Sequence, residues 1–141
     1  MEYLDTSLVV AVIAKEATSN KAQDWLIERA AGELHISDWV VAEVSSALSI
    51  KVRRGELTLD ARADSLSLFH KLLVGSFTLL PVAASHFQSA AHLADQHHLG
   101  LRAGDALHLA IASDAGARLC TLDRRLAQAG REVGASVLLL E

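Results

Sequence analysis

The sequence predicts an α/β fold with a mostly parallel sheet of five strands and helices on both of its faces. Short apolar segments alternate with helical ones, which is typical of parallel sheets. Six of the eight glycines fall just after a predicted helix. The 141 residues are 51% hydrophobic, which suits a single domain over residues 1–141 with a large buried core. No linker, internal repeat or low-complexity segment interrupts it.

In the N-terminal half, apolar runs and capping residues set the predicted boundaries. Thr6 or Ser7 is suited to cap the first helix, and Thr58 is suited to begin the last helix of this half. Val40, Val44 and Leu48 recur at helical spacing and predict a buried stripe. The predicted order is strand 2–5, helix 8–16, helix from Ser19 or Asn20 to just before Gly32, strand 34–36, helix 38–54, and helix from Thr58 to Gly75.

In the C-terminal half, glycines and the single proline set most of the boundaries. Pro81 closes a strand, because proline cannot donate a backbone hydrogen bond. The predicted order is strand 77–80, helix 85–98, helix 103–115, strand 118–121, a short helix capped by Asp123 and ending at Gly130, and strand 136–140.

The charge balance limits how the protein contacts nucleic acid. The net charge is −4, whereas proteins that hold nucleic acid by charge alone are basic. Any contact with RNA or DNA must therefore be local, metal-mediated or transient. The single cysteine, Cys120, excludes both an internal disulfide and a cysteine-based zinc site.

Hydropathy suggests where the protein works and whether it associates. The mean hydropathy is +0.27, near the apolar end for a soluble domain, so some apolar surface is expected to meet a partner. The start of the chain has no basic segment of the kind that opens a signal peptide, and the apolar run 8–14 is too short to span a bilayer. We expect a soluble, cytoplasmic protein that forms oligomers.

Four acidic residues lie in apolar surroundings. Asp5 and Asp123 each follow a predicted strand, at the edge where α/β proteins bind ligands. Glu43 shares a helix face with the buried stripe, and Asp105 lies in the apolar first turn of the helix 103–115. Buried charges must be paired or bind metal. We therefore expect all four carboxylates to converge on a divalent metal.

Each acid also has a purely structural interpretation. Asp123 and Asp5 can cap the helices that follow them, although Thr6 and Ser7 would leave Asp5 free. Glu43 can form a buried ion pair with an arginine. Asp105 can favour a helix dipole and accept a hydrogen bond from His108, itself a core histidine or a support for the acidic site.

Carboxylates acting together favour one kind of chemistry. Oxygen-only ligands select hard cations such as Mg²⁺ or Mn²⁺, which pair with substrate phosphates. Such a metal activates water, orients a phosphodiester and stabilises the leaving oxygen. Since the cation supplies the positive charge, an acidic protein can perform this reaction.

The four acids lie in motifs that resemble a PIN domain. The motifs are Tyr3-Leu-Asp-Thr-Ser7, Val41-Ala-Glu-Val-Ser-Ser-Ala-Leu48, Gly104-Asp-Ala-Leu-His-Leu-Ala-Ile-Ala112 and Thr121-Leu-Asp-Arg-Arg-Leu126. Their order, and the length of the chain, resemble VapC toxins of prokaryotic type II toxin–antitoxin modules. The resemblance covers nearly the whole chain.

The resemblance implies a PIN-like three-layer fold and a Mg²⁺- or Mn²⁺-dependent endoribonuclease. It assigns Asp5, Asp105, Glu43 and Asp123 to the acidic quartet that holds the metal and its activated water. Small polar residues, namely Thr6, Ser7 and Thr121, match supporting positions. The resemblance further implies an RNA substrate, a homodimer and a VapB-like antitoxin that covers the active site.

Basic residues near these motifs leave two interpretations open. Arg102, Arg124 and Arg125 can contact flanking phosphates or simply lie solvated at helix ends. The cluster of Lys51, Arg53 and Arg54 has the same two interpretations, and stabilisation of a helix C-terminus is the simpler one.

Other functions fit the sequence less well. A phosphoacceptor receiver domain would need a lysine late in the chain, whereas the last lysine is Lys71. A zinc site would need regular ligand spacing, which the histidines at 86, 92, 97 and 98 lack. No glycine-rich phosphate loop and no G-x-S-x-G motif is present. A non-catalytic scaffold that uses the same fold for binding is an alternative.

Overall fold

A five-stranded parallel sheet lies at the centre of the computed structural model, which describes residues 1–141. The strands are β1 (Glu2–Leu4), β2 (Leu34–Ser37), β3 (Thr78–Leu80), β4 (Arg118–Thr121) and β5 (Val137–Leu139). They lie in the order β3-β2-β1-β4-β5, and every neighbouring pair is parallel. The predicted five-stranded parallel sheet is confirmed.

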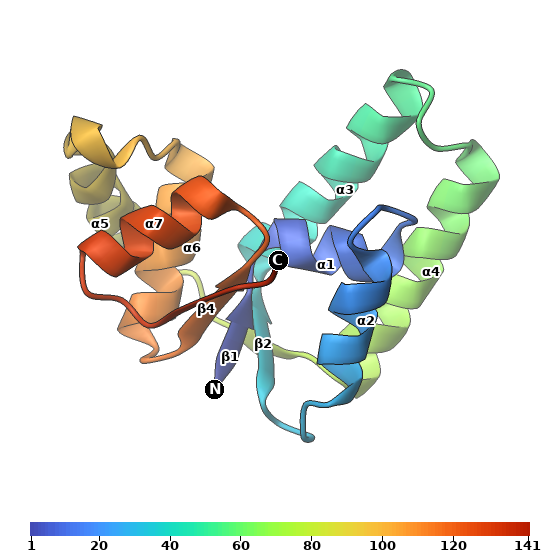
Figure 1. Cartoon of the computed structure of the whole chain (residues 1–141), viewed down its shortest axis with the longest axis horizontal. Helices are drawn as coiled ribbons and strands as arrows, with labels where there is room; N and C mark the ends of the chain where they lie inside the picture. Colours follow the sequence, from blue (N-terminus) through green and yellow to red (C-terminus); the bar gives the residue numbers. More distant parts are fainter.

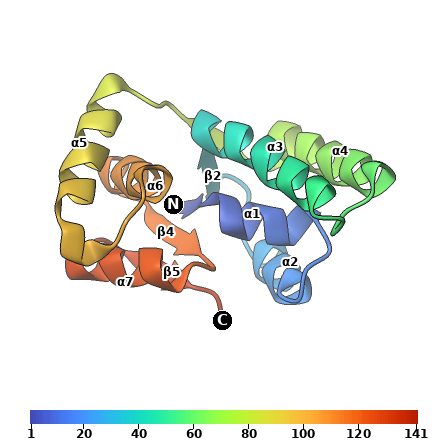
Figure 2. The same cartoon turned by 90° about the horizontal axis from the view of Figure 1, so that it is seen from above.

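Helices cover both faces of this sheet, which gives the three predicted layers. Helices α1 to α4 lie on one side and α5 to α7 on the other (Figures 1 and 2). Their bounds are α1 Thr6–Ile13, α2 Ser19–Ile27, α3 Asp38–Arg53, α4 Leu59–Gly75, α5 Ala84–Asp95, α6 Ala103–Asp114 and α7 Arg124–Glu132. None of them combines the length and the apolarity that crossing a membrane requires.

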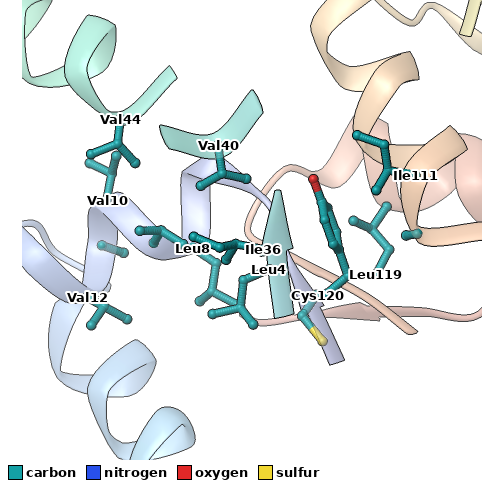
Figure 3. Packing of buried hydrophobic residues seen from close by; sticks show 14 of the residues in the cluster. Leu4, Leu8, Val10, Val12, Ile36, Val40, Val44, Ile111, Leu119 and Cys120 are labelled. Carbon is teal, nitrogen blue, oxygen red and sulfur yellow. The ribbon is translucent and has the colours of Figure 1, made fainter. Parts of the chain in front are cut away.

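The core lies on both faces of the central strand β1. Leu4, Leu8 and Ile36 are fully buried and gather between α1 and the sheet, while Ile111 and Leu119 pack on the α6 side (Figure 3). Each such side chain contributes about 1.5–3 kcal/mol through burial. The apolar faces of both helix layers therefore fix β1, and the residue that follows it, at the middle of the molecule.

The first helix differs from the prediction at both ends. It begins at Thr6 rather than Leu8, because Asp5 caps it by accepting a hydrogen bond from the backbone of Leu8. It ends at Ile13 rather than Glu16. The Ser19 hydroxyl donates to the carbonyl of Ala14 at 2.7 Å and so holds the chain in a turn there.

Two other predicted helices are shorter than expected. Helix α2 ends at Ile27, well before Gly32. Helix α5 ends at Asp95, and residues 97–99 form a short 3₁₀-helix that closes on Gly100, whose φ is +67°. The remaining boundaries agree with the prediction to within one residue, apart from those around Gly130.

Gly130 lies inside α7 and does not end it, so this boundary of the prediction was wrong. The helix continues to Glu132, and Gly134 provides the left-handed turn with φ +81°. A Cβ at position 130 would lie 2.6 Å from Cγ2 of Val137. The glycine is therefore required by the close packing of α7 against the β5 strand.

We predict that Gly130→Ala destabilises the fold by about 1–3 kcal/mol, because it overpacks this contact. Gly75→Ala is the matched control: it also lies within a helix, and an added Cβ meets nothing within 4 Å. The control is expected to leave stability unchanged or to raise it by about 0.5 kcal/mol. Urea denaturation measures both, and equal stabilities of the two variants would contradict the prediction.

Candidate functional site

The candidate site lies where the strand order of the sheet reverses. Strands β2 and β3 lie on one side of β1, and β4 and β5 lie on its other side. In open α/β sheets, ligands bind outside the carboxyl ends of the strands at such a reversal. Asp5 directly follows β1, and Thr121 ends the adjacent β4. The topology thus brings the first and last predicted acidic motifs to one edge.

Asp5 is the most deeply buried of the four acids, with 3% of its surface exposed. One carboxylate oxygen accepts hydrogen bonds from the Ser7 hydroxyl at 2.7 Å and the Leu8 amide at 3.1 Å, and the other accepts one from Thr121 at 2.5 Å. Burial raises the pKa of Asp5, against the opposing effects of His108 and these hydrogen bonds. Asp5 caps α1, so the expectation that Thr6 or Ser7 would free it from capping was wrong.

Glu43 projects from α3 and is half-buried. Its Oε1 accepts a hydrogen bond from the Thr6 hydroxyl at 2.7 Å and lies 2.5 Å from Nε2 of His108. Burial acts to raise the pKa of Glu43, but the hydrogen bonds from His108 and Thr6 outweigh it, so the pKa is lowered. The partner of Glu43 is therefore a histidine and not an arginine.

Asp105 lies in the first turn of α6, and its side chain forms no hydrogen bond or ion pair. His108 does not bond it, contrary to one expectation, because its ring is turned toward Glu43. Burial raises the pKa of Asp105. The negative charges of Asp123, Asp5 and Glu43 raise it further, against the effect of His108. Asp105 is thus the acid whose charge is least compensated.

Asp123 caps α7, as its simplest interpretation predicts. Its Oδ1 accepts hydrogen bonds from the backbone amides of Arg125 at 2.9 Å and Leu126 at 3.1 Å. Its Oδ2 has no hydrogen-bond partner and remains available. Capping and ligand binding are therefore compatible at this residue, since each uses a different oxygen.

A glycine allows α6 to approach α3 closely at the site. A Cβ at Gly104 would lie 3.1 Å from Oε2 of Glu43 and 3.4 Å from the ring of Trp39. Oε2 itself forms no hydrogen bond. The absence of a side chain at position 104 thus leaves Glu43 and the first turn of α6, which carries Asp105, in close proximity.

Two buried residues of the site were missed in the sequence. The hydroxyl of Tyr3 lies 2.9 Å from Nδ1 of His108 and 2.8 Å from the Ser37 hydroxyl. Ser37 precedes α3 at the helix-cap position, yet its side chain makes no capping hydrogen bond and bonds Tyr3 instead. A buried tyrosine hydroxyl needs a partner, and Tyr3 lies two residues before Asp5. These two facts together could have predicted a polar contact between Tyr3 and the site.

The donor set suits a hard cation, although the carboxylates are not gathered into a finished ligand cluster. No group of three or more His, Cys, Asp or Glu side chains converges to hold a metal ion. Burial and the charges of Asp123, Asp5 and Glu43 nevertheless raise the pKa of Asp105, so the four carboxylates lie close enough to affect one another. Oxygen donors with surplus negative charge are what Mg²⁺ and Mn²⁺ prefer.

A groove of about 560 Å³ leads away from the acids along α1 and α3. It begins at Thr6, Ser7 and Asp123 and ends at Lys51 and Arg54. Lys51 is neutralised by Glu16 at 2.7 Å, and Arg53 donates to the Ser49 hydroxyl outside the groove. Arg54 has neither kind of partner, so it is the unpaired cation of the groove.

The side chains of the other basic residues considered in the sequence form no ion pair with the four carboxylates. Arg102 and Arg124 are exposed, and the side chain of Arg125 reaches the carbonyl of Gly100 at 3.5 Å. Among the histidines, His86 is buried against Asp114 at 2.8 Å and accepts from the amide of Ala83. This histidine stabilises the start of α5.

Comparison with known proteins agrees with the fold and the motifs. The family described as "PIN domain" matches residues 3–132. Ribonuclease VapC3 of Pyrobaculum aerophilum is 33% identical over 129 residues, covering 89% of this chain and 91% of that protein. The crystal structure of PAE2754 from the same organism is 28% identical, with a TM-score of 0.70 over 97% of this chain and 90% of that one. VapBC2 from Rickettsia felis, solved with a DNA fragment from its promoter, shares the fold at 18% identity, with a TM-score of 0.67 over the full length of both chains.

We predict that Asp105→Asn raises the melting temperature at pH 7 without divalent metal, because it removes an uncompensated charge. The pKa of Asp105 is higher in the folded protein than in the unfolded chain, so its ionised form destabilises the fold. This loss of stability is complete above the folded pKa and disappears as the pH falls toward the unfolded pKa. The stabilisation should therefore shrink on acidification. Mg²⁺ should raise the melting temperature of the wild type more than that of the variant. Asp64→Asn, on the exposed face of α4, is the control. A lower melting temperature for Asp105→Asn at pH 7 would contradict the prediction.

Proposed function

The chain belongs to the PIN domain family and is homologous to VapC ribonucleases, and from this membership we propose that it is a Mg²⁺- or Mn²⁺-dependent endoribonuclease. In this proposal it acts in the cytoplasm as the toxin of a toxin–antitoxin pair. Asp5, Glu43, Asp105 and Asp123 form the acidic site. The observation that carries the proposal is the placement of Asp105, which is partly buried near Asp123, Asp5 and Glu43 and has no hydrogen-bond or ion-pair partner for its side chain.

The four acids have different parts in this proposal. Asp5 is a metal ligand of fixed orientation, because Thr121 and Ser7 each donate a hydrogen bond to one of its two oxygens. Glu43 offers Oε2 and Asp123 offers Oδ2, since their other oxygens are already engaged. Asp105 offers both oxygens. A divalent cation at such a site supplies the charge that activates water and stabilises the leaving oxygen of a phosphodiester.

The direct test is RNA cleavage by the purified, antitoxin-free protein with Mg²⁺ or Mn²⁺. We expect EDTA to abolish cleavage. Asp5→Asn and Asp105→Asn should reduce kcat/KM by more than the roughly 10- to 100-fold that the loss of an outer-shell partner costs. Asp64→Asn should cleave at the wild-type rate. Cleavage that persists in EDTA would reject the metal mechanism, and a folded wild type that cuts no RNA would favour a non-catalytic scaffold.

We further propose that the groove holds the RNA strand and that Arg54 contacts one of its phosphates. Arg54 lines the end of the groove that lies away from Asp123, and its side chain forms no hydrogen bond or ion pair within the chain. Arg53 is the matched control, because it is one residue away, has the same charge and lies outside the groove.

Arg54→Gln should therefore weaken the binding of single-stranded RNA and reduce the slope of log K against log salt by about 0.7, the value for one phosphate contact. Arg53→Gln should leave that slope unchanged. The measurement is a salt titration of binding to the uncleaving Asp105→Asn variant. Equal slopes for the two arginine variants would contradict the assignment of Arg54.

Two protein partners belong to the proposal. A VapB-like antitoxin would cover the acidic site, so the product of a neighbouring gene should co-purify with the chain and suppress RNA cleavage.

A homodimer would bury the apolar pocket of about 230 Å³ beside Trp39, where Phe87 is 55% exposed. Sedimentation should show a dimer that Phe87→Asp dissociates. A monomeric wild type would remove the dimer from the proposal.

A further inference from the structure

A chain of hydrogen bonds runs from the hydrophobic core to Glu43. It joins four elements: Ser37 at the end of β2, Tyr3 in β1, His108 in α6 and Glu43 in α3. The successive distances are 2.8 Å from Ser37 to Tyr3, 2.9 Å from Tyr3 to Nδ1 of His108 and 2.5 Å from Nε2 to Oε1 of Glu43. Tyr3 and Ser37 are fully buried and His108 is 2% exposed, so solvent cannot substitute for the two contacts of the Tyr3 hydroxyl.

The direction of the hydrogen bonds follows from the acceptor at the end of the chain. The Thr6 hydroxyl already donates to Oε1 of Glu43, so this oxygen acts as an acceptor, and Nε2 of His108 must carry a proton to bond it. In a neutral ring Nδ1 then has a lone pair and accepts from the hydroxyl of Tyr3. The Ser37 hydroxyl can donate to Tyr3 in turn, which leaves the Tyr3 proton for Nδ1.

We propose that Tyr3, supported by Ser37, is a positioning residue for the nuclease reaction. Its hydroxyl fixes His108 in the tautomer with the proton on Nε2, and this proton fixes the orientation of the Glu43 carboxylate at the acidic site. The inference rests on the proposed nuclease function for its catalytic consequence, but the tautomer is a property of the protein alone. A histidine that presents one nitrogen to an acid normally has its other nitrogen held in this way.

The series of hydrogen bonds ends at the acidic site, so a small movement of the His108 ring would affect Glu43 directly. A Cβ at position 104 would lie only 3.1 Å from Oε2 of Glu43, so the glycine in α6 leaves that oxygen its space. Rotation of the His108 ring would release Oε1 from its nitrogen partner and leave Thr6 as its sole donor. The orientation of Glu43 therefore depends on a tyrosine whose hydroxyl contacts Ser37 and His108 but none of the four carboxylates.

The test is ¹⁵N NMR of the histidine side chains in protein without metal or RNA, comparing the wild type with Tyr3→Phe. His108→Gln identifies the His108 signals. We expect a protonated Nε2 and an unprotonated, hydrogen-bonded Nδ1 in the wild type. In Tyr3→Phe the Nδ1 signal should move to that of a nitrogen without a hydrogen bond, or a second tautomer should appear.

The kinetic counterpart is a fall in kcat for RNA cleavage by about 10- to 100-fold in Tyr3→Phe with KM nearly unchanged. Ser37→Ala should show a smaller change in the same direction, which keeps the test valid if Tyr3→Phe folds poorly. Ser65→Ala, which removes a buried hydroxyl in α4, is the control and should alter neither readout.

Two results would overturn the inference: a wild-type His108 that carries a proton on Nδ1, whether or not Nε2 is also protonated, or an unaltered His108 spectrum and kcat in both Tyr3→Phe and Ser37→Ala. A wild type that cuts no RNA would instead reject the nuclease function. The spectrum would still decide the tautomer in that case, so the two failures are distinguishable.

Discussion

The buried carboxylate of Asp5 is the constraint on which the site depends. It joins the ends of two adjacent strands, because Thr121 at the end of β4 donates to it and its own backbone amide donates to Cys120 in β4. It also begins α1 by accepting from Leu8. An unpaired charge at this depth would cost several kcal/mol. The surrounding donors offset part of that cost and fix the carboxylate in a single orientation.

The other acids are arranged around this fixed point with progressively weaker compensation. Glu43 has a histidine and a threonine, Asp123 has two backbone amides, and Asp105 has no partner. The protein thus concentrates negative charge at the edge of its sheet and leaves one carboxylate unsatisfied. This arrangement costs stability and is typical of a site whose ligand supplies the missing charge.

The sequence predicted the layers, the five strands and the placement of acids at the sheet edge, because alternating segments and strand-end positions are local patterns. The family match supports the resemblance seen in the motifs and sets aside the phosphoacceptor alternative. The sequence could not predict which residue pairs with Glu43, because His108 is 65 residues away and reaches it only through the packing of α6 on α3. Gly130 was misplaced for a related reason, since the contact that requires it comes from Val137 in β5. Whether the four acids bind a metal together stays a prediction.

The capping roles of Asp5 and Asp123 have a consequence for how the family's sequences are interpreted. Each of these residues begins a helix, so the fold itself favours keeping them even in a descendant that has lost its chemistry. Asp105 begins no helix, receives no hydrogen bond and burdens the folded state with its charge. Once catalysis ceased to matter, drift would remove Asp105 first. Under the proposed function, the residue at this position in a homologue is therefore a better indicator of catalysis than the two aspartates at the strand ends.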